Sequence, residues 1–316
     1  MNAIQIEGLQ KTYGAVKALD GLDLAVETGS VFGFLGPNGA GKTTTLRILT
    51  GLAQASGGRA WVADVEVTAR GGGSVGGLAK NFGYLPEEPA FYNWMTPREC
   101  LDYVGQLFGL PASARRARTT ELLDLVGLAE VGKRRIGGFS RGMRQRLGLA
   151  QALVNQPPVL FLDEPASALD PMGRKEVLDL IERLRGRCTV FMSTHILADV
   201  ERVCDGVGII ARGRLLSQGP RADLLARYAV PAFELEADAG GESALAGWAT
   251  AQRQQPWVTA ASISGRTARL TVSDVAAAKQ ALLPAVVAAG LTLTRYEMVQ
   301  PSLEDIFLRL VGEAGQ

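Results

Sequence analysis

A glycine-rich run at residues 36–43 has the residue types that hold phosphate groups. It reads Gly-Pro-Asn-Gly-Ala-Gly-Lys-Thr, follows an apolar run ending at Leu35, and precedes a helical pattern beginning at Thr44. Glycines allow backbone N–H groups to close around phosphates, and a helix N-terminus adds positive potential. In this context we expect Lys42 to contact the β- and γ-phosphates of a nucleotide and Thr43 to bind Mg²⁺, rather than a tight turn with an exposed lysine. The predicted nucleotide-binding residues of this run are Gly36, Pro37, Asn38, Gly39, Ala40, Gly41, Lys42, Thr43 and Thr44.

Two adjacent carboxylates follow a second apolar run. Residues 159–162 are Val-Leu-Phe-Leu, and Asp163 and Glu164 come directly after them. Asp163 is placed to hold Mg²⁺, directly or through water, and Glu164 to polarise an attacking water, a role worth about 10²–10⁴-fold in rate. Acids that only solvate a strand end are the alternative, and the upstream glycine-rich loop argues against it.

A third segment, residues 139–145, lies between these two in the sequence and reads Phe-Ser-Arg-Gly-Met-Arg-Gln. Ser140 can cap the helix predicted to follow it, and Gly142 would let a ligand approach the backbone closely. Taken alone, the pattern indicates an ordinary capped helix.

The elements that position these residues alternate between short apolar runs and amphipathic helical stretches up to about residue 219. This alternation predicts parallel strands joined by crossover helices. The strands expected are 31–35, 159–162, 189–192 and 207–210, and their continuous apolar character is typical of strands covered on both faces. A glycine-rich stretch at residues 71–77 is predicted to be a flexible surface loop.

The composition changes after Arg221. Alternating and helical patterns then follow in the order β-α-β-β-α-β, which resembles a ferredoxin-like unit. Ser302 and Asp305 form a capping-box pattern before a final helix. We therefore expect a nucleotide-binding domain over residues 1–220 and a small α+β accessory domain over residues 221–316.

In their order along the chain, the first three segments resemble the ATP-binding cassette (ABC) ATPase family over roughly two-thirds of the sequence. Residues 139–143 match the position of the LSGGQ signature, with Phe, Arg and Met replacing Leu, Gly and Gln. Ser140 and Gly142, whose positions contact the γ-phosphate in the family, are kept. The resemblance implies an α/β P-loop NTPase fold: a RecA-like core with antiparallel β and helical subdomains.

Three further positions match family elements. Asp170, in Ser-Ala-Leu-Asp, resembles the D-loop that communicates across a dimer, and His195 resembles the switch histidine that contacts the γ-phosphate. Tyr13 resembles the aromatic residue that stacks on adenine, although a tyrosine at a strand end often only packs. Glu164 and His195 are therefore the predicted catalytic residues.

One position departs from the family pattern. Glu87, in Pro-Glu-Glu-Pro, occupies the place of the Q-loop glutamine that contacts Mg²⁺. A carboxylate can also bind Mg²⁺, so Thr43, Asp163 and Glu87 are the predicted metal ligands. The Pro-Glu-Glu form and the C-terminal segment at residues 299–307 resemble the exporter-type branch of the family.

The resemblance implies an ATP- and Mg²⁺-dependent motor for export through a separate transmembrane permease. The ATP held by one subunit would be capped by the signature of a second, in a homodimer or in a heterodimer with a paralogous ATPase. A soluble ABC ATPase acting as a regulatory or assembly factor is the alternative. A two-cassette translation factor, a coiled-coil DNA-repair ATPase and a nonenzymatic sensor fit the sequence less well, because it has one cassette, closely spaced motifs and an intact Glu164.

Bulk composition limits the other classes of function. The chain has 316 residues, 33 Lys and Arg against 32 Asp and Glu, and a net charge of +1, which gives no electrostatic case for nucleic-acid binding. No apolar run reaches the ~20 residues needed to cross a bilayer. Three cysteines without paired spacing indicate reduced thiols. We expect a cytoplasmic protein that is peripheral to the membrane through its permease.

Large apolar residues follow Glu87 in a stretch without helical or strand periodicity: Phe91, Tyr92, Trp94 and Met95. We predict that this cluster docks the permease. Packing under the helix expected at residues 97–108 is the alternative.

Overall fold

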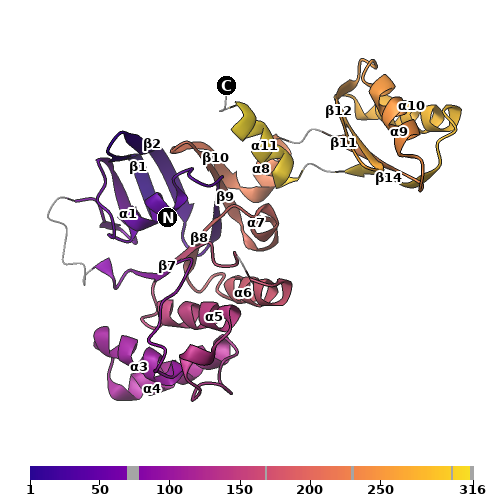
Figure 1. The fold of residues 1–316 in the computed structure, drawn as a ribbon. Coiled ribbons are helices and arrows are strands. Elements are labelled where there is room, and N and C mark those ends of the chain that lie inside the picture. The colour runs from indigo at the N-terminus through magenta and orange to yellow at the C-terminus, as the bar shows by residue number, and fades with distance from the viewer. Residues whose placement is uncertain (70–77, 168, 229–230, 300–301, 314–316) are drawn as a thin grey trace. The chain divides into compact units, whose positions relative to one another are not determined.

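The computed structural model describes residues 1–69, 78–167, 169–228, 231–299 and 302–313, so the stretch 71–77 lies outside the described residues. The chain separates into two compact units (Figure 1). The first contains Met1–Ala222 together with the segment that begins at Val311, and the second contains Asp223–Leu310. The expected boundary after residue 220 lies close to this division.

A six-stranded sheet forms the centre of the first unit. Its strand order is β10-β9-β3-β8-β7-β6, with β10 antiparallel to β9 and the other strands parallel. The four predicted strands are all present, and every residue of β3, β7 and β8 is buried, as expected of a sheet covered on both faces. The strands of this sheet are β3 (Val31–Leu35), β6 (Phe82–Leu85), β7 (Val159–Asp163), β8 (Thr189–Thr194), β9 (Gly206–Ala211) and β10 (Arg214–Pro220).

A second, antiparallel sheet of order β2-β1-β4-β5 packs on this centre. Alternate residues of β1, such as Ile4 and Ile6, point into a core that also contains Phe34, Phe161 and Phe191 of the parallel sheet. The Phe34 and Phe191 ring centroids lie 5.2 Å apart. Helix α1 (Lys42–Leu49) contacts strands of both sheets, so its N-terminus is fixed from two sides. The strands of this sheet are β1 (Asn2–Tyr13), β2 (Val16–Glu27), β4 (Gly57–Val62) and β5 (Val65–Glu66).

A helical subdomain follows β6 (Figure 1). Its first helix is fixed by a capping box, in which Thr96 and Glu99 satisfy each other's backbone N–H groups. Ser140 caps α5 as predicted, because its hydroxyl accepts from the Met143 N–H at 3.2 Å. The helices are α3 (Pro97–Leu107), α4 (Ala112–Leu125), the 3₁₀ turn η1 (Ile136–Gly138) and α5 (Arg141–Ala152). The helices α6 (Pro171–Arg183) and α7 (Leu197–Val203) also belong to the first unit, and α8 (Arg221–Arg227) spans the division between the two units.

The second unit has the predicted order of strands and helices. Its four antiparallel strands are arranged β12-β13-β11-β14, and α9 and α10 pack on one face of the sheet (Figure 1). Ser302 and Asp305 cap α11 reciprocally, at 2.9 and 3.3 Å, which confirms the predicted capping box. The elements are β11 (Ala232–Ala237), α9 (Glu242–Gln252), β12 (Val258–Ser264), β13 (Thr267–Val272), α10 (Val275–Ala288), β14 (Leu293–Val299) and α11 (Leu303–Glu313).

Candidate nucleotide-binding site

The glycine-rich loop joins β3 to α1 and is shaped by close backbone contacts. A Cβ atom at Gly36 would lie 2.4 Å from the carbonyl oxygen of Ile210, so no larger residue fits there without movement. Gly41 has a φ of +111°, and a Cβ atom there would lie 2.8 Å from the carbonyl oxygen of Ala18. These glycines therefore let the loop turn directly into the first turn of α1, whose free N–H groups favour an anion.

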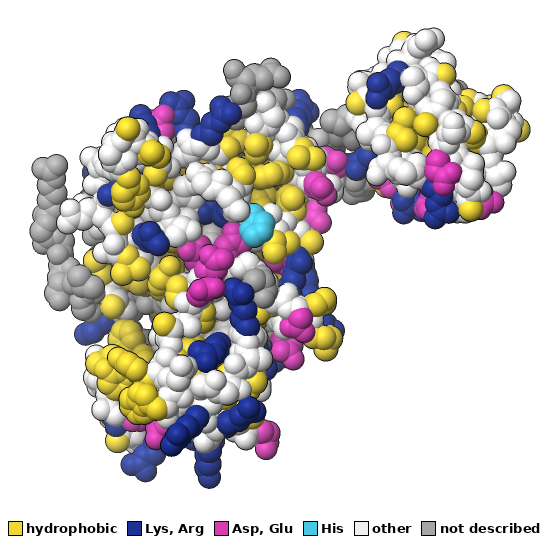
Figure 2. All heavy atoms as spheres, in the orientation of Figure 1, with side chains coloured by type: hydrophobic (Ala, Val, Ile, Leu, Met, Phe, Trp, Pro, Cys, Tyr) yellow, Lys and Arg dark blue, Asp and Glu magenta, His cyan; other side chains and the backbone are white. Residues whose placement is uncertain are grey.

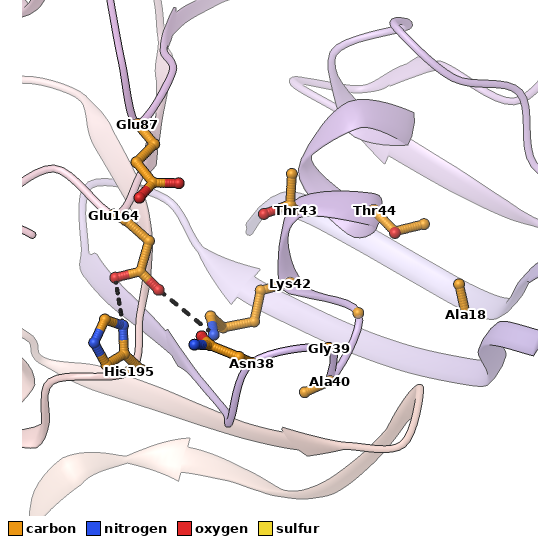
Figure 3. A pocket seen from close by; sticks show the side chains of 11 residues that line it. Ala18, Asn38, Gly39, Ala40, Lys42, Thr43, Thr44, Glu87, Glu164 and His195 are labelled. Carbon is orange, nitrogen blue, oxygen red and sulfur yellow. Dashed lines mark hydrogen bonds and ion pairs between the residues drawn. The ribbon is translucent and has the colours of Figure 1, made fainter.

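A pocket of about 380 Å³ opens over this loop (Figure 3). Lys42, Thr43 and Thr44 lie on one side of it, and Glu87, Glu164 and His195 lie on the facing side. The structure thus gathers residues from five separate segments of the sequence into one cavity. Its lining residues are Ala18, Asn38, Gly39, Ala40, Gly41, Lys42, Thr43, Thr44, Glu87, Glu164 and His195, of which only Ala18 was not expected from the sequence.

Lys42 is buried in the wall of this pocket. Its ammonium group donates to the carbonyl oxygens of Gly36 at 2.7 Å and Pro37 at 3.3 Å. It also lies 3.5 Å from Oε1 of Glu164. A buried cation with a single carboxylate partner is well placed to gain anionic partners, because further negative charge offsets the cost of its burial.

Glu164 lies between the lysine and the histidine. Its Oε2 atom lies 2.9 Å from Nδ1 of His195, while its side chain is almost fully buried and that of His195 is half exposed. The backbone of Glu164 has a φ of +47°, which is uncommon for a residue with a Cβ atom. Figure 2 shows the single histidine at the surface beside a group of acidic side chains, so this end of the pocket is open to solvent.

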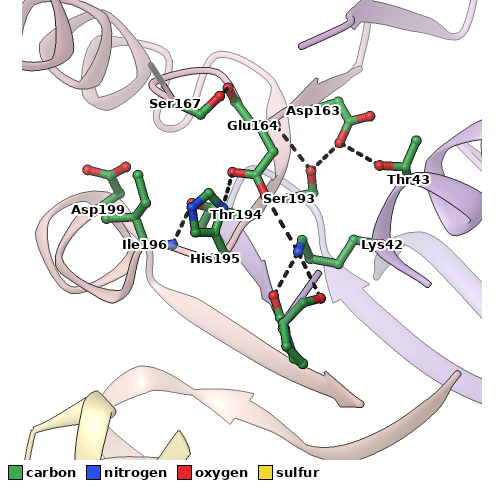
Figure 4. Close-up of polar contacts among 12 residues, drawn as sticks. Lys42, Thr43, Asp163, Glu164, Ser167, Ser193, Thr194, His195, Ile196 and Asp199 are labelled. Atoms are coloured by element: carbon green, nitrogen blue, oxygen red, sulfur yellow. Dashed lines mark hydrogen bonds and ion pairs between the residues drawn. The ribbon is translucent and has the colours of Figure 1, made fainter. Parts of the chain in front are cut away.

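Asp163 is buried beside Thr43. The Thr43 hydroxyl donates to Oδ1 of Asp163 at 3.3 Å, and the Ser193 hydroxyl donates to the same oxygen at 2.6 Å (Figure 4). Burial raises the pKa of Asp163 above its usual value, and the two hydrogen bonds oppose that change. Sequence analysis did not identify Ser193. The pairing of Asp163 with Ser193 in the parallel register of β7 and β8 brings them together.

The donor set fits Mg²⁺. A hydroxyl and a carboxylate oxygen, which this ion prefers, lie together at Thr43 and Asp163, and Glu87 lines the same pocket. Over the part of the chain that the structure describes, no group of three or more His, Cys, Asp or Glu side chains could hold a metal.

Seven predicted residues are not part of the pocket lining. Three of them, Gly36, Pro37 and Asp163, are sequence neighbours of lining residues or contact them, and the other four are Tyr13, Ser140, Gly142 and Asp170. Tyr13 is about half exposed, and the Lys11 ammonium lies 4.7 Å from its ring centroid. Ser140 and Gly142 begin α5, and Asp170 caps α6 by accepting from the Gly173 N–H at 3.3 Å. A Cβ atom at Gly142 would lie 3.9 Å from Gly173, so these two helix starts are neighbours. Ser140, Gly142 and Asp170 thus form a second surface outside the pocket.

A glycine-rich loop that opens a helix, with a buried lysine and two carboxylates at the end of a second parallel strand, β7, defines a P-loop nucleoside triphosphatase. Profiles described as "ABC transporter" and "ATP-binding protein DrrA1-3-like, C-terminal domain" match residues 19–167 and 219–311. The chain is 39% identical to the uncharacterized ABC transporter ATP-binding protein YxlF of Bacillus subtilis, over 98% of this chain and 99% of that protein. It belongs to the ABC transporter ATP-binding protein family.

Two further relatives support this assignment. The chain is 35% identical to the daunorubicin resistance ATP-binding protein DrrA3 of Streptomyces coeruleorubidus, over 98% of this chain and 96% of that protein. The structure of cbiO1 from Clostridium perfringens, part of the ABC transporter complex cbiONQ, matches 71% of this chain and 91% of its own, with a TM-score of 0.65 and 27% identity. The protein is therefore an ATP-binding subunit of an ABC transporter, and ATP hydrolysis is the characteristic activity of its family. Within the described residues, no helix is long and apolar enough to cross a membrane.

Proposed function

We propose that this subunit hydrolyses ATP to power export of a substrate through a separate transmembrane permease. The observation that carries the proposal is the pocket itself, which gathers a phosphate loop, a buried lysine, two carboxylates and a histidine from one chain. The name of the relative DrrA3 refers to daunorubicin resistance, which supports export as the direction of transport. The motor would act on the cytoplasmic face of the membrane.

The proposed chemistry follows from the contacts. Lys42 and the loop N–H groups bind the phosphates, and Thr43, Asp163 and Glu87 would hold Mg²⁺, which neutralises phosphate charge when bound. Glu164 accepts a proton from the attacking water, and His195 contacts both Glu164 and the terminal phosphate. Ser140, Gly142 and Asp170 lie outside the pocket lining, and membership of the ABC family implies that they act on the nucleotide of a second subunit. The chain carries every element, so a homodimer suffices, and a heterodimer with a paralogous ATPase is the alternative.

We further propose that the loop after Glu87 binds the permease. Tyr92 and Trp94 are 60% and 63% exposed, with ring centroids 5.8 Å apart, so neither packs under α3. The loop is nonetheless ordered, because the Gly137 N–H donates to Asn93 O at 3.0 Å and the Ile136 N–H donates to Met95 O at 2.9 Å. Phe91 and Met95 are half-buried. An ordered pair of exposed aromatic rings is typical of an interface hot spot.

Basic residues flank this aromatic pair. Lys133, Arg134 and Arg135 directly precede Ile136, and all three are exposed. No carboxylate among the described residues forms an ion pair with them. Residues 90–153 contain ten Lys and Arg against five Asp and Glu, in a chain whose net charge is +1. We therefore expect the permease segment that binds here to combine apolar and acidic residues.

The test is copurification of the permease encoded with this subunit. Replacing Tyr92 and Trp94 with Ala should reduce permease recovery and permease-stimulated ATP hydrolysis by about tenfold or more, because hot-spot aromatics contribute at least ~2 kcal/mol each. A matched control replaces Tyr103 and Leu107 with Ala, which are 42% and 69% exposed on α3. Equal recovery of the permease with both double variants would rule out this docking surface. An active ATPase that recovers no permease even in wild-type form would favour a regulatory or assembly factor.

A further inference from the structure

Ser193 contacts both acidic residues of the site, the carboxylate of Asp163 and the backbone of Glu164. It lies on β8 and is fully buried, and its hydroxyl donates to Oδ1 of Asp163 at 2.6 Å (Figure 4). The same hydroxyl accepts from the Glu164 N–H at 3.2 Å. One side chain thus both donates to one carboxylate residue and accepts from the next, which a serine or threonine can do and an alanine cannot.

The contact between Ser193 and Asp163 determines which oxygen of the Asp163 carboxylate is available to bind a cation. Ser193 and Thr43 both donate to Oδ1. No described residue donates to the other oxygen, Oδ2, so a cation has one uncommitted oxygen to bind. Burial disfavours the charged carboxylate, and the short bond from Ser193 opposes that effect.

The contact with Glu164 fixes an uncommon backbone conformation. Glu164 has a φ of +47°, a region that residues with a Cβ atom occupy only when neighbours stabilise it. Its N–H lies 3.1 Å from the carbonyl oxygen of Ser193 as well as 3.2 Å from the hydroxyl. From this conformation the Glu164 side chain reaches both Lys42 and His195.

We propose that Ser193 is a positioning residue that orients Asp163 for Mg²⁺ and holds Glu164 in its left-handed conformation. Without the hydroxyl, the Asp163 carboxylate keeps only the 3.3 Å bond from Thr43, and the backbone N–H of Glu164 keeps only its bond to the Ser193 carbonyl oxygen. The proposal concerns how these side chains are held, and it rests on the assignment of Asp163 as a metal ligand.

The test compares Ser193→Ala with Thr189→Val. Thr189 lies on the same strand, is also buried, and its hydroxyl accepts from the Gly29 N–H at 2.9 Å, away from the carboxylates. ATP affinity is measured by calorimetry with and without Mg²⁺ for the full chain. In Ser193→Ala the increase in ATP affinity that Mg²⁺ provides should fall by about tenfold, which is the size expected for the loss of a hydrogen bond to a charged group. The ATP affinity measured without Mg²⁺ should stay at the wild-type value.

Turnover supplies a second measurement. Ser193→Ala should lower kcat by about tenfold or more, and Ser193→Thr, which keeps the hydroxyl, should restore most of the loss. Ser193→Cys, with a weaker donor of similar size, replaces Ser193→Ala if the latter does not fold. An unchanged Mg²⁺ effect on ATP affinity in Ser193→Ala, or an equal loss in Thr189→Val, would overturn the proposal. If Glu164→Gln instead left hydrolysis intact, the proposed function would fail independently of Ser193.

Discussion

The Nδ1 atom of His195 lies 2.9 Å from Oε2 of Glu164, and Oε1 of the same carboxylate lies 3.5 Å from Nζ of Lys42. One buried carboxylate therefore contacts the lysine of the phosphate loop and the half-exposed histidine that follows β8. A phosphate that entered between them would compete with Glu164 for both partners. In the proposed function, this arrangement would link the presence of nucleotide to the freedom of Glu164 to accept a proton.

Replacing His195 with Ala should lower turnover about a hundredfold, as expected for the loss of one preorganised contact to the reacting phosphate. ADP lacks the terminal phosphate, so its affinity should stay close to the wild-type value. Steady-state ATP hydrolysis and ADP titration measure the two effects. His195 is the only histidine in the chain, so its imidazole NMR signals report directly whether they shift with ATP. A parallel loss of ATP and ADP affinity would instead show that His195 has a structural role.

The two-unit organisation predicts that the first unit folds alone. A chain ending after Tyr228 keeps α8 whole, including Leu224, which is fully buried. It loses the separate core around Phe233 and Leu270, and also the short segment from Val311 that belongs to the first unit. We expect cooperative thermal unfolding and ATP affinity within about threefold of wild type, since the pocket is lined only by residues up to His195. Insoluble protein that does not bind nucleotide, from several neighbouring end points, would show that the two regions depend on one core.

The cysteines give a pH prediction. Burial raises the pKa of Cys100 and Cys188 to about 11 and that of Cys204 to about 12, from the usual 9.0. At pH 8 the folded protein should therefore react slowly with iodoacetamide, which needs thiolate, whereas all three thiols should react at once in denaturant. The unfolded chain loses these protons first as the pH rises, so the free energy of unfolding should fall above about pH 9. Mass spectrometry measures the rate at which the cysteines are labelled. Fast labelling of the native protein would contradict the burial of these thiols.

The sequence predicted the parallel strands because their residue types are uniformly apolar. Val159 to Leu162 had to be covered on both faces, and the structure buries all of them. The two long strands β1 and β2 were not assigned individually, because their pairing shifts register several times and interrupts a simple alternation. The helix caps at Ser140 and Ser302 could be predicted from the sequence, because a cap is a local contact between residues three positions apart.

The site residues also fall into two groups: those that a local sequence pattern predicts and those that depend on how the chain folds. The loop residues and the Asp163–Glu164 pair could be read from types and spacing, because one segment carries each of them. The role of Ser193 depends on the register of two parallel strands, which no local pattern encodes. The exposure of Tyr92 and Trp94 likewise depends on how their loop is fixed to residues 136–137. The predicted stacking of Tyr13 on adenine stays a prediction, since its ring lies outside the pocket lining.

The central claim is that Glu164 activates the attacking water in a site completed by a second subunit. Its most direct test is the Glu164→Gln variant, with Glu88→Gln as control, because Glu88 lies on the surface and pairs with Arg141. With Mg²⁺ and ATP, Glu164→Gln should retain ATP binding, lose about 10²–10⁴-fold in hydrolysis, and form a dimer that contains one ATP per subunit. Size-exclusion chromatography with light scattering and nucleotide analysis of the dimer peak measure this outcome. Hydrolysis within a few-fold of wild type, or a monomer with bound ATP, would contradict the account.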